Sequence, residues 1–493
     1  MVDHRMRLVA VIVFLALMVP ILTTPIVPVI DFYYHILRYY VLAGEIEGME
    51  AFYEPNWQVL PNLGLDIIGL GVAQLFPPLI GAKLIFALLV GGFYWAGLAA
   101  ATALSGRLQP AAIAIFAIAS YSHILSWGFS NFLLGLSLAM LCLAIWVRME
   151  NRPVAQVAVA AALGLLIMVV HAFSFMVWGL LLACYELGRL GPERRDYIAR
   201  LPARWLRLAP VALPAFLFFL ASETAGGGEP ITTSIASLVG YAEAGQLMER
   251  LIQEVWKRAY SFLRVSESGF VALDIALGLA LWGAIAAFLL SGAMRLDRRI
   301  VPALIFFAVL VVITPPRFFG VGVVDARIPL VLLCLFAVAL RPGAAERGRA
   351  VPVFLTGLVA VKIGAMIASY ASLAPRYADF VASAPALQPG GIMAAWLPLE
   401  QEDREGRKFC APLAPAAGMM RSLGVPTFAI ATQQPILLTG ELYTARKTRE
   451  ERGGPDALAA GFDYYVVCSS LEGVDYGAPL IEGDGWRVYA RER

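Results

Sequence analysis

Three side chains suited to acid–base and phosphate chemistry follow the first apolar segment at helical spacing. Asp31, His35 and Arg38 stand at positions i, i+4 and i+7 of the stretch DFYYHILRYYVLA. If this stretch is helical, it presents a carboxylate, an imidazole and a guanidinium on one face. Ionisable groups held next to hydrocarbon are costly unless they are used, so we predict that residues 29–60 form an active-site loop. The alternative is an interfacial amphipathic helix whose polar face merely meets water and lipid headgroups.

The same loop carries residues that could bind a sugar. Glu54, Asn56 and Trp57 lie together in the sequence YEPNWQ. The face of a tryptophan ring suits the apolar face of a hexose, while the carboxylate and the amide can hydrogen-bond its hydroxyls. An ordered loop with its tryptophan anchored at the membrane interface is the alternative interpretation.

Two further sites lie between apolar segments. The turn TPPRFFGVGVVDARIPL contains Arg317, Asp325 and Arg327, and arginine is favoured for bidentate contacts to phosphate. We therefore consider Arg317 and Arg327, together with Arg38, as phosphate-binding residues; the alternative is a turn in which Asp325 forms a salt bridge with an arginine. His171, in MVVHAFSF, is a substrate-binding candidate because ionisable groups in membrane segments are often functional, although a hydrogen-bonded structural histidine fits the same pattern.

Composition identifies the broad class of the protein. Hydrophobic residues make up 60% of the chain and charged residues 15%, and the mean hydropathy is +0.73, whereas soluble domains carry about 25% charged residues. The chain is therefore predicted to be an integral membrane protein. The net charge of +2 does not indicate a nucleic-acid partner. The sequence also lacks the GxxxxGK[ST], HExxH, EF-hand and GxSxG motifs.

Apolar segments of roughly bilayer length fill most of the chain up to residue 371. After the N-terminal run, they lie at 61–77, 79–104, 110–124, 128–147, 154–170, 172–190, 206–222, 270–291, 300–314, 328–341 and 351–371. A membrane-spanning helix needs about 20 apolar residues. We predict an α-helical polytopic membrane protein with about 11–13 membrane helices. The segment 61–77 is expected to be re-entrant or interfacial, because it is short, carries Asn62 and Asp66, and ends at two prolines.

Basic turns predict the orientation of these helices. The N-terminal sequence MVDHRMR and the turns VRMENRP, RLDRR and RPGAAERGR are typical of cytoplasmic segments under the positive-inside rule. This topology predicts a cytoplasmic N-terminus, and the Ala/Arg/Gly-rich composition without other targeting signals favours a bacterial inner (plasma) membrane. The topology sends four polar stretches to the outer face: the first loop at 29–60, the turn at 126–132, a long loop at 223–269 and the turn at 314–327.

Residues 372–493 differ in character from the membrane domain at 1–371. Proline, glycine and charge return, and PTFAIAT, QPILLTG, FDYYVVCSS and WRVYARER are typical of strands. APAAGMMRSLG and GGPDALAAG are short helix candidates, so we expect a small periplasmic α/β domain. Cys410 and Cys468 lie in this region without the spacing of a zinc site. An oxidising compartment would permit a disulfide between them, but their spacing leaves this open.

The general plan resembles a family of membrane enzymes. A first helix, an outer loop opening with an acidic residue, an aromatic juxtamembrane helix, many further helices and a C-terminal α/β domain resemble the GT-C glycosyltransferases that use polyprenyl-phosphate sugars. This group includes protein O-mannosyltransferases, the aminoarabinose transferase of lipid A and oligosaccharyltransferase catalytic subunits. The resemblance covers the plan of the whole chain, and its local match is the first loop with Asp31.

The resemblance implies a reaction and a role for Asp31. It implies inverting transfer of a sugar from a polyprenyl-phosphate donor to a lipid, glycan or protein acceptor at the outer face of the membrane, among membrane lipids. The position that matches the family's acidic residue is Asp31, as catalytic base or as part of a metal site. Many members pair two acidic residues here, whereas Phe32 follows Asp31 in this chain. Dependence on a divalent cation is therefore left open, with Asp31 as the ligand if one binds.

Other functions remain alternatives. A transporter or flippase of lipid-linked sugar would predict inverted repeats and charged residues inside mid-membrane helices. The sequence shows no obvious repeat, and Lys83 and Lys362 are the charges well inside apolar runs. A surface-polysaccharide polymerase or ligase, or a relative that has lost catalysis, would share the same general plan.

Overall fold

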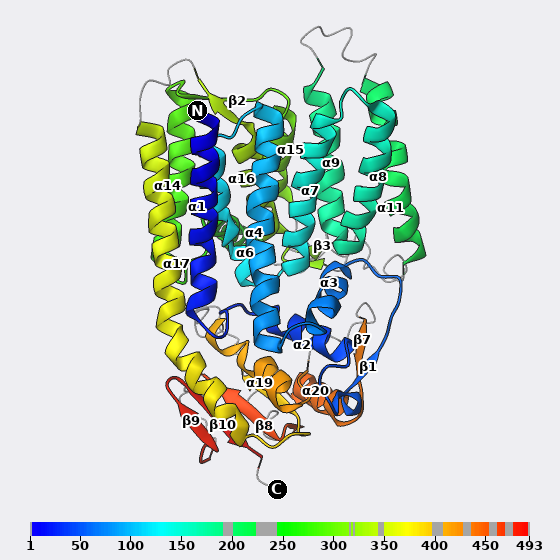
Figure 1. Cartoon of the computed structure of the whole chain (residues 1–493), viewed down its shortest axis with the longest axis vertical. Coiled ribbons are helices and arrows are strands. Elements are labelled where there is room, and N and C mark those ends of the chain that lie inside the picture. The colour runs from blue at the N-terminus through cyan, green and yellow to red at the C-terminus, as the bar shows by residue number, and fades with distance from the viewer. Residues whose placement is uncertain are drawn as a thin grey trace. The chain divides into compact units, whose positions relative to one another are not determined.

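The structure is a computed structural model of the chain. It describes residues 2–190, 201–222, 244–314, 317–318, 321–343, 350–396, 408–426, 435–452, 461–468 and 477–491. These residues form mostly helices, with a few small sheets (Figure 1). Among them, six helices are long and apolar enough to cross a membrane. They are α1 (Val2–Thr23), α4 (Pro78–Ser105), α7 (Ser130–Arg148), α8 (Pro153–Val170), α14 (Val271–Leu290) and α17 (Ala350–Ser383). The predicted α-helical polytopic membrane fold is confirmed.

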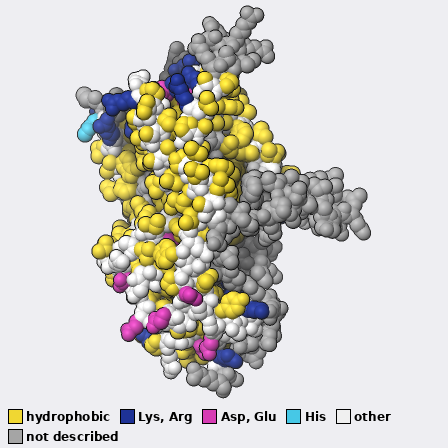
Figure 2. Space-filling view, turned by 90° about the vertical axis from the view of Figure 1, so that its right-hand side faces the viewer, with side chains coloured by type: hydrophobic (Ala, Val, Ile, Leu, Met, Phe, Trp, Pro, Cys, Tyr) yellow, Lys and Arg dark blue, Asp and Glu magenta, His cyan; other side chains and the backbone are white. Residues whose placement is uncertain are grey.

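Shorter apolar helices account for the remaining predicted segments. They are α3 (Gly64–Ala73), α5 (Pro110–Ser120), α9 (Ala172–Gly188), α11 (Ala209–Ala221), α15 (Val301–Ile313) and α16 (Ile328–Ala339). The segment predicted to be re-entrant corresponds to α3, which has ten residues against the roughly 20 that a span requires. Figure 2 shows one face of the molecule, on which apolar side chains form most of the surface along the helices. A surface of this kind suits a lipid environment.

The chain divides into two compact units. The first comprises Met1–Leu17, Leu89–Ile124 and Asn131–Ala365, and the second comprises Met18–Leu88, Leu125–Ser130 and Met366–Arg493. Within unit 1, α8 packs against both α9 and α11, α15 packs against α9 and α16, and α16 packs against α5 (Figure 1). Close packing at Gly164 illustrates why: a Cβ there would lie 2.7 Å from the Trp178 ring, so α8 and α9 meet only where glycine leaves room.

Unit 2 joins the first loop to the C-terminal residues. Helix α2 (Phe32–Leu42) contacts α3 and α19 (Leu413–Arg421), and β1 (Tyr53–Pro55) pairs antiparallel with β7 (Ile436–Leu438). A four-stranded sheet has the order β6-β8-β10-β9, from β6 (Met393–Trp396), β8 (Tyr464–Val467), β10 (Trp486–Ala490) and β9 (Ile481–Gly483). Strands β6 and β8 are parallel, and the other pairs are antiparallel. The expected small α/β region is therefore present.

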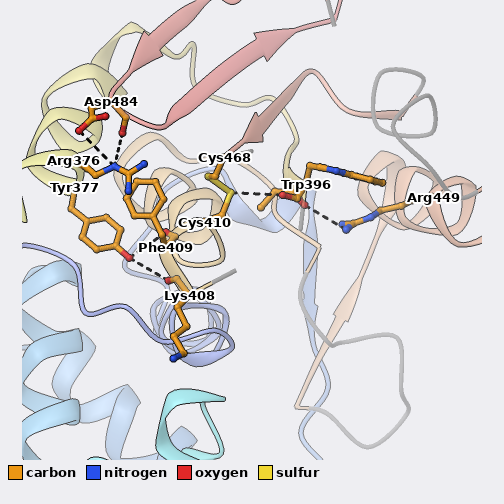
Figure 3. Close-up of a disulfide and its surroundings, with 10 residues drawn as sticks. Arg376, Tyr377, Trp396, Lys408, Phe409, Cys410, Arg449, Cys468 and Asp484 are labelled. Atoms are coloured by element: carbon orange, nitrogen blue, oxygen red, sulfur yellow. Dashed lines mark hydrogen bonds and ion pairs between the residues drawn. A yellow bond between two sulfur atoms is a disulfide. The ribbon is translucent and has the colours of Figure 1, made fainter. Parts of the chain in front are cut away.

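A disulfide joins Cys410 and Cys468 within unit 2, with Cα atoms 5.7 Å apart. Around it, the Arg376 guanidinium lies 4.1 Å from the Phe409 ring centroid, and the Tyr377 hydroxyl donates to the backbone oxygen of Lys408 at 3.2 Å (Figure 3). The bond that cysteine spacing left open is thus formed, and it ties the segment before α19 to the end of β8.

Two helices differ from the sequence-based boundaries. Helix α17 continues to Ser383, past residue 371 where the apolar run ends, although Pro375 lies inside it and charged residues return there. The region predicted as the long loop 223–269 contains α13 (Ala244–Leu263); its mixture of charged and apolar residues gives a strong 3.6-residue periodicity but low mean hydropathy. Residues 223–243 and most of the candidate helix GGPDALAAG lie outside the described residues.

Candidate active site

The backbone of unit 2 holds Asp31 at the start of α2. Helix α1 ends at Thr23, and Asp31 is the N-cap residue of α2. The Asp31 N–H donates to the backbone oxygen of Trp127 at 3.2 Å, and the preceding Ile30 N–H donates to Ser126 O at 3.1 Å. These two bonds fasten the first loop to the turn at residues 125–130, so the position of Asp31 does not depend on its side chain.

Gly128 allows this turn to lie against Asp31. Its φ is +90°, a conformation that side chains other than glycine rarely adopt. A Cβ at Gly128 would lie 2.8 Å from the Asp31 Cβ and 2.8 Å from the Phe32 backbone nitrogen. Both the backbone conformation and the available space therefore require glycine here.

The Asp31 carboxylate is half-buried and uncompensated. No hydrogen bond or ion pair reaches its side chain from the residues that the structure describes. Burial raises the pKa of Asp31 to about 7, because removal from water penalises the charged form. A carboxylate with a pKa near the working pH is suited to accept a proton.

The other two residues of the predicted helical face have different surroundings. Arg38 is buried and makes two parallel hydrogen bonds to Asp66 on α3, from Nε to Oδ1 at 2.7 Å and from Nη2 to Oδ2 at 3.0 Å. Its guanidinium therefore holds α2 to α3. His35 is half-buried on α2, and burial, followed by the positive charge of Arg38, holds its pKa well below the usual range. The His35 imidazole is neutral at pH 7.

Tyr34 connects this site to the C-terminal helix α20 (Gly440–Arg452). The Tyr34 hydroxyl interacts electrostatically with Arg449, Asp31 and Arg446, and burial raises its pKa to about 12. Arg446 and Arg449 are three residues apart on α20 and thus share a face. The N-terminus of α20 is anchored to the first loop, because the Thr439 N–H donates to Phe52 O at 2.9 Å. Two guanidinium groups of the C-terminal region therefore act on Tyr34.

The predicted sugar-binding residues lie on and after β1. Glu54 is exposed and pairs with Leu437 in the β1–β7 register. The Asn56 N–H donates to Pro435 O at 2.7 Å, and the Trp57 ring is half-exposed. The strand pairing orders this part of the loop while Glu54 and Trp57 remain accessible to a ligand.

Unit 1 brings together two other predicted residues, His171 and Arg327. His171 lies between α8 and α9, and Arg327 ends a short 3-10 helix (Asp325–Arg327) before α16. Both are buried, and Arg327 Nη1 lies 3.4 Å from His171 Nε2. The Ser174 backbone N–H donates to His171 Nδ1 at 3.2 Å, so in the neutral ring the proton is assigned to Nε2. Arginine can only donate, so Nε2 accepts from Arg327 only in the other tautomer; a neutral His171 ring satisfies one of these two contacts at a time.

Aromatic rings fix the Arg327 guanidinium. It lies 5.4 Å from the ring centroid of Phe132 and 5.9 Å from that of Phe173, which is within the range of cation–π attraction. Asp325 is half-buried and interacts with Arg327 through its charge. The backbone of Arg317 forms β3 (Arg317–Phe318) opposite β4 (Val321–Gly322), but its side chain lies outside the described residues.

A divalent-cation site is not built among the described residues. No group of three histidine, cysteine, aspartate or glutamate side chains gathers there. The involvement of Asp31 in a metal site therefore stays a prediction.

Three residues near the candidate site, Gly128, Arg446 and Arg449, were not predicted from the sequence. The contact of Gly128 with Asp31 joins positions about a hundred residues apart, and Arg446 and Arg449 belong to a charged helix that resembles any solvated helix. The glycine in the turn SWGFSNF is the sequence signal that could have indicated a close backbone approach at Gly128. The i, i+3 spacing of Arg446 and Arg449 is too common to indicate a site.

Comparison with known proteins finds a structural likeness. No protein-family model and no curated protein matches the chain. Among solved structures, the chain is similar to arabinofuranosyltransferase AftD from mycobacteria, with 16% sequence identity and a TM-score of 0.48. The alignment covers 100% of this chain and 42% of that chain, so this chain spans less than half the length of the protein it matches. At that score, the likeness does not establish a shared fold.

Proposed function

We propose that the protein is a membrane glycosyltransferase in which Asp31 is the catalytic base. The observation that carries the proposal is the half-buried Asp31 carboxylate at the start of α2, in the loop after the first membrane helix; its pKa is about 7, and no hydrogen bond or ion pair reaches it from the described residues. Strongly perturbed ionisable groups gather at functional sites, and a charge placed at the end of a membrane helix is costly unless it is used.

The proposed reaction transfers a sugar from a polyprenyl-phosphate donor to an acceptor hydroxyl. Asp31 accepts the proton of the hydroxyl as the hydroxyl oxygen attacks the anomeric carbon. The bond between that carbon and the donor phosphate oxygen breaks, and its electron pair stays on the polyprenyl phosphate. Attack from the opposite face inverts the anomeric centre. A positioned base accelerates such a step by about 10²–10⁴-fold. The proposed step does not require a metal ion.

The leaving phosphate requires cationic or N–H donors. Within unit 1, Arg327 is a buried cation in contact with His171, and aromatic rings hold its guanidinium in one orientation. On this chemistry we propose Arg327 and His171 as a phosphate-binding pair of unit 1. Arg446 and Arg449 are a second pair of cations, within reach of the Tyr34 hydroxyl, and they would stabilise negative charge developing next to the base.

We propose that accessible side chains of the first loop bind the sugar of the donor or of the acceptor. Trp57 offers an aromatic face, and Glu54 and Asn56 offer hydrogen-bonding groups. The acceptor class and the sugar are left to experiment. We further propose an inner-membrane location with a cytoplasmic N-terminus and a periplasmic C-terminal region; the Cys410–Cys468 disulfide supports an oxidising compartment for that region.

The test is transfer of radiolabelled sugar by the purified full chain in detergent from a panel of polyprenyl-phosphate sugars. The wild type is compared with Asp31→Asn and with Asp379→Asn, which removes an exposed aspartate of the same unit. We expect transfer by the wild type and by Asp379→Asn and loss of transfer in Asp31→Asn. Transfer that persists in Asp31→Asn would refute the role of Asp31, and the absence of transfer from every donor would refute the enzyme class.

A further inference from the structure

Four helices of unit 1 enclose an apolar groove. Its volume is about 690 Å³, and it lies between α13, α14, α15 and α16. Side chains that form its walls include Phe262, Trp282, Ile285, Leu332 and Phe336. Sites for small ligands typically have volumes of about 300–1,000 Å³, so this groove is large enough to take one hydrocarbon chain.

The walls of the groove are preformed. The Trp282 ring stacks on Phe262 with centroids 4.4 Å apart and meets Phe336 edge-on at 5.7 Å. The Trp282 Nε1–H donates to the backbone oxygen of Phe262 at 2.9 Å. Because both the ring and its polar atom are held, the groove does not need to close or rearrange to take a ligand.

One cation borders the groove. Arg258 on α13 donates from Nη1 to Val311 O at 3.0 Å and from Nη2 to Thr314 O at 2.9 Å, at the C-terminal end of α15. No carboxylate pairs with Arg258 among the residues that the structure describes. A guanidinium has five N–H donors, so Arg258 is held in place by two bonds and keeps its charge and further donors for an anion.

Helix α13 continues the apolar surface beyond the groove. Val255 and Trp256 are 65% and 70% exposed, and Ile252 is also exposed, on one side of an amphipathic helix. Helices of this composition lie in the membrane interface, where tryptophan is enriched. The exposed Val255 and Val312 also line the groove, so its mouth is continuous with an apolar surface.

We propose that this groove binds one acyl chain of an anionic glycerophospholipid, with the lipid phosphate at Arg258. The apolar walls match the chain, and the Arg258 guanidinium beside them, which pairs with no carboxylate among the described side chains, matches an anionic headgroup. The lipid is a resident of the site rather than the substrate of the transfer reaction. The inference does not depend on the proposed glycosyltransferase activity.

Native mass spectrometry of the full chain tests whether the groove holds the lipid. The chain is stripped of lipid in detergent and titrated with phosphatidylglycerol. We expect the wild type to retain one lipid per chain, and Ala286→Trp and Ala308→Trp, which fill the groove from two different helices, to lose it. Leu290→Trp is the matched control, because residue 290 on α14 is fully exposed and does not line the groove. Retention by both filling variants at wild-type thermal stability would overturn the proposal.

The headgroup is tested by comparing phosphatidylglycerol with diacylglycerol, which lacks the phosphate. We expect Arg258→Gln to reduce the preference for phosphatidylglycerol by about tenfold, since glutamine keeps a hydrogen-bond donor but lacks the charge that pairs with the phosphate. Lys257→Gln removes the same charge from the exposed neighbouring position and should retain the preference. Equal loss in both variants would overturn the role of Arg258. Displacement of phosphatidylglycerol by a hundredfold lower concentration of polyprenyl phosphate would assign the groove to that lipid and overturn the proposal.

Discussion

A buried charge site in unit 1 and a half-buried one in unit 2 are built in opposite ways. In unit 1, Glu267 accepts from His123 Nδ1 at 2.7 Å and pairs with Arg264, while the Lys362 ammonium donates to the Glu267 backbone oxygen at 2.5 Å. Every charge of this network has a partner. In unit 2, Asp31 has none among the described residues, although its backbone is held firmly by the turn around Gly128.

The contrast separates a paired network of charges from the carboxylate that we propose as the catalytic base. Paired buried charges hold helices together. Removing one partner strongly destabilises the fold, because the other charge stays buried without compensation. A buried carboxylate that is left uncompensated costs stability in the native state and is retained for what its raised pKa allows. Substitutions at the two sites should therefore affect different measurements.

The largest expected effect is on catalysis at Asp31. Asp31→Asn keeps the size of the side chain but cannot accept the proton, so transfer should fall by about 10²–10⁴-fold with little loss of folded protein. Single-turnover assays with saturating donor measure this directly. A fall smaller than a few-fold would show that the base lies elsewhere in the chain.

Loss of stability is expected instead at Glu267. Glu267→Gln leaves the Arg264 guanidinium buried without its partner, which should cost about 3–5 kcal/mol, measured as a drop in melting temperature in detergent. The control is Glu482→Gln at the half-exposed pair with Arg487, which should change stability by less than about 1 kcal/mol. An unchanged melting temperature in Glu267→Gln would remove the distinction between the two sites.

A smaller effect on both measurements is expected at Gly128. In Gly128→Ala, the new Cβ collides with Asp31 and Phe32, and the positive φ costs about 1–3 kcal/mol. Displacing the carboxylate should lower kcat by roughly 10–100-fold with KM nearly unchanged. Gly71→Ala on α3 is the control, because nothing lies within 4 Å of its Cβ. A normal kcat in Gly128→Ala would show that the turn does not position the base.

The smallest expected effect is a change in how stability depends on pH. A folded-state pKa raised from 3.8 to about 7 means that the native state holds the proton more tightly than the unfolded chain, so stability falls as pH rises between these values. Asp31→Asn should therefore be more stable than the wild type at pH 8, by on the order of 2 kcal/mol after allowance for partial exposure, and equal to it near pH 4. Equal melting temperatures at pH 8 would indicate an ordinary pKa.

Sequence reasoning succeeded for elements whose signal is local. The spacing of Asp31, His35 and Arg38 predicted α2, and the apolar runs predicted nearly every membrane-length helix. Contacts between segments far apart in the sequence could not be predicted. Asp66 counted only as evidence that residues 61–77 do not cross the membrane, because no local pattern shows that α3 brings Asp66 to Arg38. The raised pKa of Asp31 likewise depends on burial by residues from several parts of unit 2.

The measurement that tests the central claim most directly is the pH dependence of single-turnover sugar transfer by the wild type. With Asp31 as the base, the rate should rise with pH as the carboxyl ionises and level off above a midpoint near 7. Gly128→Ala, which moves the carboxylate, should shift that midpoint, and Gly71→Ala should leave it in place. A rate that is already constant above pH 5 in the wild type would contradict the assignment, because the base would then have the pKa of an ordinary exposed carboxylate.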